Sequence, residues 1–219
     1  MGCHRHPRRN RGSGPPRPVS TEHGAARHFG AAADGYTEFR GRGLLGRIRR
    51  QEQRAVRELA PIDAGALALD AGCGDGETLS WLAGRGANAV GVDLSLPMAA
   101  GCAGRGHTVS VQDMNNLAFG PVFDWVLCIG SLEFVAQPHH ALSELARCLN
   151  PKGRFVLLYP RRGLLGALYT LYHRSHGTRI HTFRRPQISQ LLAVSGLEEP
   201  ERWRRCVLAD VCVTGRPAE

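Results

Sequence analysis

LALDAGCGDGETL, residues 67–79 of this 219-residue chain, is the stretch that decides the fold. A short apolar run ends at Asp70, and glycines follow at every second position, at Gly72, Gly74 and Gly76. A β-strand that feeds a glycine-rich turn and then a helix is how α/β proteins hold nucleotide-like cofactors. Because glycine lacks a Cβ, it adopts positive φ easily and lets a ligand approach the backbone. The following amides and the helix N-terminus point into the same crevice, so the stretch predicts a cofactor loop.

The spacing of these glycines distinguishes between cofactors. A dinucleotide site has the pattern G-x-G-x-x-G around a pyrophosphate, whereas this chain has D-x-G-x-G-x-G. A pyrophosphate would meet like charge at Asp70, which instead suits a cofactor with a cationic end. The pattern resembles motif I of the class I S-adenosylmethionine-dependent methyltransferases, in which this acid lies near the amino acid end of the cofactor. The resemblance implies that S-adenosylmethionine contacts the residues of this loop: Asp70, Ala71, Gly72, Cys73, Gly74 and Gly76.

A second acid follows Asp70 by twenty-three residues. The apolar run 89–92 ends at Asp93, where a carboxylate at the end of a second strand accepts hydrogen bonds from the ribose hydroxyls. An alternative interpretation is that Asp93 caps the following helix, a place that Asp and Ser favour. Both interpretations can hold together, and the adjacent Leu94 is expected to belong to the same site.

A third strand is predicted over residues 108–111, and it leads to Asp113 and Met114. In the resembling family this place holds the adenine: the resemblance implies that Asp113 accepts from the exocyclic amine and that Met114 packs on the ring. Taken alone, Asp113 and Met114 are weak evidence for an adenine site. The prediction depends on their place in the order of the family's motifs.

The near-continuous apolar run within residues 123–135 indicates a strand that is covered on both faces. It resembles the family's fourth strand and the loop beneath the methionine part of the cofactor, which places Ile129 at the site. Many members of the family carry His after the Glu of this loop, but here Phe134 follows Glu133. The departure removes one candidate base from the predicted site without changing the predicted fold.

Strands that alternate with helical segments predict a parallel, doubly wound sheet. A fifth strand is expected within residues 149–160, after a break at Pro151 and Gly153. The resemblance extends over about residues 60–160. It implies an α/β, Rossmann-like, doubly wound and mostly parallel seven-stranded sheet with helices on both faces and an antiparallel last strand. Residues 206–215 alternate enough to form that last strand.

The sequence divides into three parts. Residues 1–24 are basic, lack an apolar period and are expected to be a disordered tail. Residues 25–60 are expected to form an N-terminal helical cap, in which Tyr36 either closes over the cofactor or is simply a packed ring. Residues 61–219 are expected to form the Rossmann-like methyltransferase domain, with a substrate-lid insertion near residues 161–186.

The insertion combines apolar and basic residues. Its apolar residues fall at helical spacing: Leu164, Leu165, Leu168, Leu171 and Tyr172. Such a stripe with basic edges suits a hydrophobic substrate that bears an anionic group, although the stripe is equally compatible with packing on the N-terminal helices. Histidine is the natural general base near neutral pH. His173, His176 and His181 are candidate catalytic bases by location alone, and a structural or surface role is the favoured interpretation of each.

Charge is distributed unevenly along the chain. Residues 61–150 carry a net charge of −6, whereas residues 1–60 carry +8 and residues 151–219 carry +7. An acidic cofactor half matches a cationic sulfonium, and basic flanks attract an anionic substrate, a membrane surface or nucleic acid. Lys152 is the only lysine, so part of the positive charge reflects a composition rich in arginine.

The cysteines argue for a reducing environment. The chain has seven cysteines, none forms a C-x-x-C pair, and no Cys/His set has the spacing of metal ligands, so no metal is predicted. Cysteines in apolar patterns behave as small buried hydrophobes, which favours the cytoplasm. The sequence also lacks an uninterrupted apolar stretch of transmembrane length and the apolar core of a secretory signal.

These observations predict an S-adenosylmethionine-dependent methyltransferase that acts on a small-molecule or lipid-like acceptor by in-line displacement. The basic flanks leave an RNA or protein methyltransferase as an alternative. Nucleic acid is not favoured, because the sequence has no nucleic-acid motif and no N/D-P-P-Y-like catalytic motif follows the fourth strand. A non-catalytic cofactor-binding protein is a further alternative. A nucleotide-dependent redox enzyme is disfavoured by the glycine spacing.

Overall fold

The fold is described from a computed structural model of the chain, which describes residues 43–217. The predicted tail, the first part of the predicted cap and Tyr36 lie outside the described residues. Within residues 43–217, no helix has both the length and the apolar character that a membrane-spanning segment needs.

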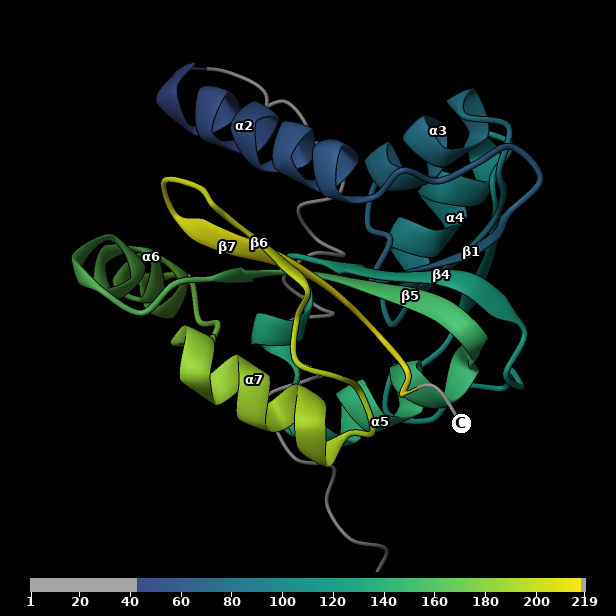
Figure 1. Cartoon of the computed structure of the whole chain (residues 1–219). Coiled ribbons are helices and arrows are strands. Elements are labelled where there is room, and N and C mark those ends of the chain that lie inside the picture. Colours follow the sequence, from purple (N-terminus) through teal and green to yellow (C-terminus); the bar gives the residue numbers. More distant parts are fainter. Residues whose placement is uncertain (1–42, 218–219) are drawn as a thin grey trace, which may run out of the picture.

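Seven strands form one sheet in the order β3-β2-β1-β4-β5-β7-β6 (Figure 1). The strands are β1 (Leu67–Ala71), β2 (Asn88–Asp93), β3 (Thr108–Val111), β4 (Phe123–Ile129), β5 (Leu149–Pro160), β6 (Arg202–Arg205) and β7 (Ala209–Gly215). The pairs among β1 to β5 are parallel, and β7 is antiparallel to both of its neighbours, β5 and β6. The predicted Rossmann-like sheet with an antiparallel last strand is confirmed.

Helices cover both faces of the sheet, as Figure 1 shows. They are α2 (Gly43–Leu59), α3 (Glu77–Gly84), α4 (Leu96–Gly104), α5 (Pro138–Cys148), α6 (Leu164–Ser175) and α7 (Arg185–Val194), with a short 3₁₀ helix η1 (Leu132–Phe134) after β4. Helices α2, α3 and α4 lie on one face, and α5 and α7 pack together on the other. Helix α6 lies at the margin of the sheet, beyond the end of β5.

The two faces of β4 show why its sequence is apolar from Trp125 to its end. Val126 and Cys128 belong to the core beneath α5 and α7, whereas Leu127 belongs to the core beneath α2 and α3. Successive side chains of a strand point to opposite faces, so a strand covered on both faces buries consecutive apolar residues. The core thereby fixes the carboxyl ends of β1, β2 and β4 beside one another.

The C-terminal strands differ in detail from the prediction. The last strand begins at Ala209 rather than at Cys206, because residues 206–208 form the connection from β6. Strand β6, Arg202–Arg205, was not predicted, because its RWRR sequence lacks an apolar pattern. This strand lies at the edge of the sheet, where charged residues are favoured because they prevent pairing with another chain.

Candidate cofactor and acceptor site

A cleft opens at the carboxyl ends of β1, β2 and β4, where the chain has continued to opposite sides of β1. Open α/β sheets bind ligands at such a reversal of strand order. Its lining residues come from α2, the glycine loop, the ends of β2 and β3 and the loop after β4: Arg49, Gln53, Asp70, Gly72, Cys73, Gly74, Asp75, Glu77, Thr78, Val92, Asp93, Leu94, Ser95, Met98, Gln112, Asp113, Met114, Asn115, Ile129, Gly130, Ser131, Phe134 and Val135.

Two glycines of the loop are required by their surroundings. Gly72 has a φ of 76°, and a Cβ added there would lie 2.4 Å from the Cβ of Ser131. Gly76 has the same φ and is the N-cap of α3, where an added Cβ would lie 2.6 Å from the Sγ of Cys102. The glycine loop therefore passes close to the loop after β4 and to α4, and only glycine fits at positions 72 and 76.

Asp93 links the loop to the next helix. Its Oδ2 accepts a hydrogen bond of 2.9 Å from the backbone N–H of Gly74, and its Oδ1 accepts one of 2.8 Å from that of Ser95. Burial raises the pKa of Asp93, and these two hydrogen bonds oppose the rise. The N-cap of α4 is Ser95, which accepts from the N–H of Met98, so Asp93 is not itself the cap. Each carboxylate oxygen keeps further acceptor capacity for a ligand in the cleft.

Asp70 and Gln53 give the cleft its electrostatic character. Asp70 is 2% exposed, and burial, with the negative charges of Asp93 and Asp75, raises its pKa to about 8. Within residues 43–217, no hydrogen-bond donor reaches its Oδ2, and none reaches the Oε1 of the buried Gln53. Buried acceptors are normally satisfied, so two unsatisfied oxygens in one cleft indicate a ligand that donates hydrogen bonds there.

The expected cofactor fits this donor requirement. S-adenosylmethionine carries a cationic ammonium group and a sulfonium, both of which favour a carboxylate in the charged form. Asp70 and Gln53 are the residues suited to the ammonium end, and Asp93 is suited to the ribose. Toward the adenine end, Asp113 is held by hydrogen bonds from the backbone and side-chain nitrogens of Asn115, at 2.8 and 2.9 Å.

Most of the predicted cofactor residues come together in this cleft. The lining includes Asp70, Gly72, Cys73, Gly74, Asp93, Leu94, Asp113, Met114 and Ile129. Ala71 and Gly76 are not among the lining residues. The carbonyl of Ala71 accepts a hydrogen bond of 2.8 Å from the Oγ of Ser131, which ties the start of the glycine loop to the loop after β4. Burial raises the pKa of the Cys73 thiol well above its usual range, which agrees with a packing role.

None of the three candidate catalytic histidines is among the described residues that line the cleft. His173 is buried on the inner face of α6, where its ring lies edge-on to Phe134 at a centroid distance of 5.4 Å. His176 is exposed, and its Nδ1 lies 2.8 Å from the carbonyl of Tyr172. His181 is exposed and donates its backbone N–H to the carbonyl of Glu133. Their roles as bases stay predictions.

Helix α2 falls within the predicted cap, but the sequence did not predict that Arg49 and Gln53 line the cleft. The Nε of Arg49 donates a hydrogen bond of 2.8 Å to Glu77, and its guanidinium lies 3.9 Å from Asp75, so α2 is tied to the start of α3 and to the glycine loop. Gln53 lies one turn further along α2 and is buried beside apolar residues. A polar residue on the buried face of an amphipathic helix was the available signal.

Comparisons with known proteins agree with this geometry. The family described as "Methyltransferase domain" matches residues 69–157. The chain is 30% identical over 156 residues to the ubiquinone biosynthesis O-methyltransferase of Dechloromonas aromatica, covering 63% of this chain and 67% of that protein. It is 33% identical over 124 residues to the demethylmenaquinone methyltransferase of Mycobacterium tuberculosis, covering 55% and 53%.

The solved structures share the fold at lower identity. The magnesium protoporphyrin IX methyltransferase of Synechocystis, solved with bound S-adenosylhomocysteine, matches with a TM-score of 0.73 at 21% identity, covering 88% of this chain and 98% of that one. The chain spans 51% to 67% of the length of the ubiquinone biosynthesis O-methyltransferases that it matches. With the cleft described above, these similarities identify an enzyme whose cofactor is S-adenosylmethionine. The chain belongs to the class I S-adenosylmethionine-dependent methyltransferases.

Proposed function

We propose that this methyltransferase acts on a small, lipid-like acceptor of quinone type. The observation that carries the proposal is the composition of the cleft, which is acidic around the expected cofactor and apolar where the loop after β4 closes it. The ubiquinone and demethylmenaquinone methyltransferases named above support the same class of acceptor.

Side chains of the loop after β4 would form the acceptor end of the cleft. Ile129 ends β4, and Phe134 and Val135 follow at the end of η1; all three line the cleft. An aromatic ring such as Phe134 stacks on a flat ring at little conformational cost. These residues favour an aromatic or quinone-like acceptor over a charged chain.

When bound, S-adenosylmethionine supplies a methyl group attached to a positively charged sulfur. The contribution of this chain is to hold the two reactants in line. Asp70 and Gln53 bind the amino acid end, Asp93 binds the ribose, and Phe134 orients the acceptor. Positioning of this kind accounts for up to about 7–11 kcal/mol of a reaction barrier.

Proton removal is the remaining chemical task. Among the described residues that line the cleft there is no histidine or lysine. An acceptor with an acidic hydroxyl, which ionises easily, needs less help from a base than an alcohol or amide does. The cleft therefore favours a phenol- or enol-type oxygen or an activated carbon as the atom that receives the methyl group.

The charge of the cleft argues against the RNA alternative. Five acidic residues line it, Asp70, Asp75, Glu77, Asp93 and Asp113, and the one arginine among its described residues, Arg49, is engaged with two of them. A phosphate backbone beside the cleft would be repelled by these carboxylates, because nucleic-acid sites depend on positive charge.

The test is methyl transfer from labelled S-adenosylmethionine to a panel of acceptors. The panel contains a hydroxylated quinol with a short isoprenoid tail, bulk tRNA and a protein extract. We expect a mass gain of one methyl group on the quinol alone. Transfer only to tRNA or to protein would reject the proposed acceptor class, and cofactor binding without transfer to any member would favour the non-catalytic alternative.

A further inference from the structure

Helix α6 exposes the apolar stripe that the sequence analysis singled out. Leu164, Leu168 and Leu171 are 80%, 56% and 63% exposed, and Leu165 and Tyr172 are also exposed. The opposite face is the buried one: it carries Gly166 and His173, and an added Cβ at Gly166 would lie 2.0 Å from the carbonyl oxygen of Arg161. The helix thus packs on the domain through its small and polar side and presents its leucines outward.

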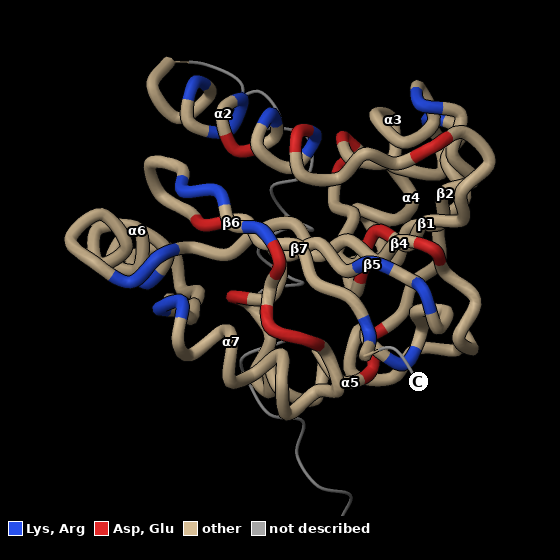
Figure 2. The backbone as a smooth tube through the Cα atoms, in the orientation of Figure 1, with Lys and Arg blue, Asp and Glu red and all other residues tan. Residues whose placement is uncertain are grey.

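Positive charge borders this stripe. From residue 161 to residue 197 the sequence contains six arginines and no acidic residue. Figure 2 shows blue segments next to α6 and at the start of α7, and no red on either helix. A groove beside the helix is lined by Arg162, Arg174 and Arg184, together with Thr170 and Thr182.

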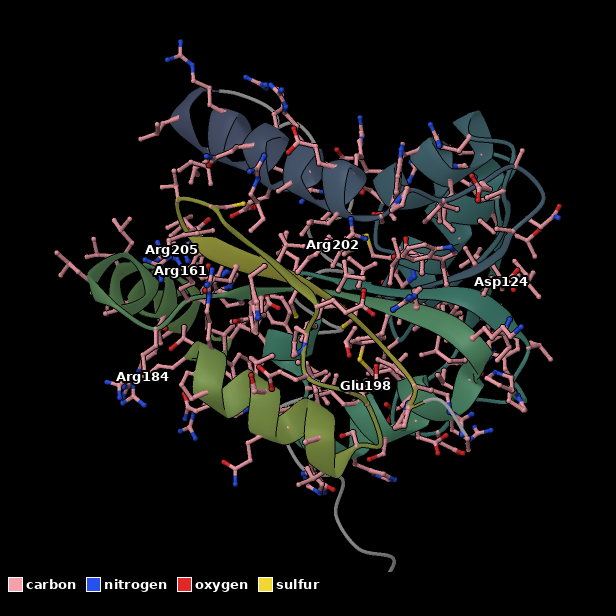
Figure 3. The ribbon with its side chains drawn as sticks, in the orientation of Figure 1. Asp124, Arg161, Arg184, Glu198, Arg202 and Arg205 are labelled. Carbon is pink, nitrogen blue, oxygen red and sulfur yellow. The ribbon has the colours of Figure 1, made fainter. Side chains whose placement is uncertain are left out.

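Among the described residues, these three arginines have no acidic partner, unlike their neighbours. Asp210, which is buried in β7, engages Arg161, Arg185 and Arg205. Figure 3 shows Arg161 and Arg205 together at the α6 end of the sheet, and Arg184 extending outward near the start of α7. Within residues 43–217, no ion pair is formed by the three arginines of the groove.

We propose that α6 and the groove of Arg162, Arg174 and Arg184 form a docking face for an anionic phospholipid bilayer. Exposed leucines on one face of a helix, edged by arginine and tyrosine, are suited to the boundary between headgroups and acyl chains. Unpaired arginines complement anionic headgroups, which neither a second basic copy of this chain nor a neutral bilayer would do.

The position of α6 relates docking to the site. On the inner face of α6, His173 contacts Phe134, which lines the cleft. The outer face of α6 would meet the membrane. The inference rests on the proposed function in this respect: a bilayer would deliver a lipid-like acceptor beside the acceptor end of the cleft. Binding to vesicles is nevertheless measured without cofactor or acceptor, so it can fail or succeed independently of the acceptor class.

The experiment is flotation of the full chain with vesicles of phosphatidylcholine alone and with an equimolar mixture of phosphatidylcholine and phosphatidylglycerol. We expect the chain to float with the anionic vesicles and to be released by high salt, which screens exposed charges. Leu164→Gln/Leu168→Gln/Leu171→Gln and, separately, Arg162→Gln/Arg174→Gln are each expected to weaken binding by about tenfold or more.

Matched controls remove similar groups elsewhere. Val122→Gln/Val194→Gln replaces two exposed apolar residues outside α6, and Arg47→Gln/Lys152→Gln removes two exposed positive charges; both are expected to bind vesicles as the unchanged chain does. The single variant Leu168→Gln replaces the triple variant if circular dichroism shows that the triple variant is misfolded.

Three results would overturn the proposal. The first is no flotation with anionic vesicles. The second is that the leucine variant and the arginine variant both float as the unchanged chain does. The third is that the same substitutions abolish a dimer or binding to bulk tRNA instead of binding to vesicles, which would assign the face to a second copy or to nucleic acid.

Discussion

The carboxylate of Asp93 accepts a 2.9 Å hydrogen bond from the backbone N–H of Gly74, and this bond joins the end of β2 to the glycine loop. The other oxygen of Asp93 accepts from the backbone N–H of Ser95 at the start of α4. One side chain therefore holds two backbone segments that surround the cleft. Binding of the ribose and the shape of the loop are expected to depend on each other through this carboxylate.

Replacement of Asp93 tests this coupling. Asp93→Ala is expected to weaken S-adenosylhomocysteine binding by about 1–3 kcal/mol, because the ribose hydroxyls and two N–H groups lose their acceptor. Titration calorimetry measures the change. Asp124→Ala is the matched control: Asp124 accepts from the backbone N–H of Leu67 at 2.8 Å outside the cleft, so its loss should lower the free energy of unfolding and leave affinity unchanged. Unchanged affinity in Asp93→Ala would exclude the ribose assignment.

Replacement of Gly72 tests how closely the glycine loop approaches the loop after β4. Gly72→Ala places a methyl group 2.4 Å from the Cβ of Ser131 at a φ of 76°. Overpacking and a left-handed backbone each cost about 1–3 kcal/mol, so a lower free energy of unfolding and weaker cofactor binding are expected. Urea denaturation and calorimetry measure them. Gly101→Ala in α4, where an added Cβ meets nothing within 4 Å, should not destabilise the protein.

The sequence was sufficient for the features that depend on local pattern. The glycine loop, Asp70 and Asp93 were predictable because turn chemistry and the strand that precedes it are contiguous in the chain. The apolar run of β4 was predictable because burial on both faces leaves a direct trace in composition. Each of these features lies within a single strand or the turn that directly follows it, so a local pattern is enough to identify it.

The missed features depend on distant segments. Gln53 reaches the cleft because α2 packs on one face of the sheet and is tied through Arg49 to the start of α3, and the sequence of α2 alone does not show what Gln53 faces. The strand β6, Arg202–Arg205, was missed because an edge strand needs few apolar residues. Burial of His173 against Phe134 likewise depends on the packing of α6, which local sequence does not specify.

The raised pKa of Asp70 predicts that the stability of the cofactor-free protein depends on pH. Its folded-state pKa is raised from 3.8 to about 8, so between these values the folded state binds a proton that the unfolded state has lost. The free energy of unfolding should therefore fall as pH rises through this window. Asp70→Asn, which cannot ionise, should lack this part of the slope. Urea denaturation at several pH values measures it; identical slopes in both proteins would contradict the raised pKa.

The same group predicts proton release when the cofactor binds. A cationic ligand favours the charged carboxylate, so binding near pH 7 should lower the pKa of Asp70 and release its proton. Calorimetry of S-adenosylmethionine in buffers of different ionisation enthalpy reports the number of protons released. Asp70→Asn should bind more weakly and release fewer protons. Equal proton release by both proteins would assign the proton to another group.

Substitution of the histidines in and after α6 distinguishes a catalytic base from a packing residue. His173→Ala is expected to lower the free energy of unfolding by about 2–5 kcal/mol, because the buried ring loses contact with Phe134 and Tyr169. His173→Phe keeps an aromatic ring and should retain most of the stability and of the turnover on the acceptor found in the panel. His176→Ala and His181→Ala change exposed side chains and should alter neither quantity. A His173→Phe protein that is stable and binds cofactor, but has lost turnover at all pH values, would instead show that the imidazole of His173 acts as the base.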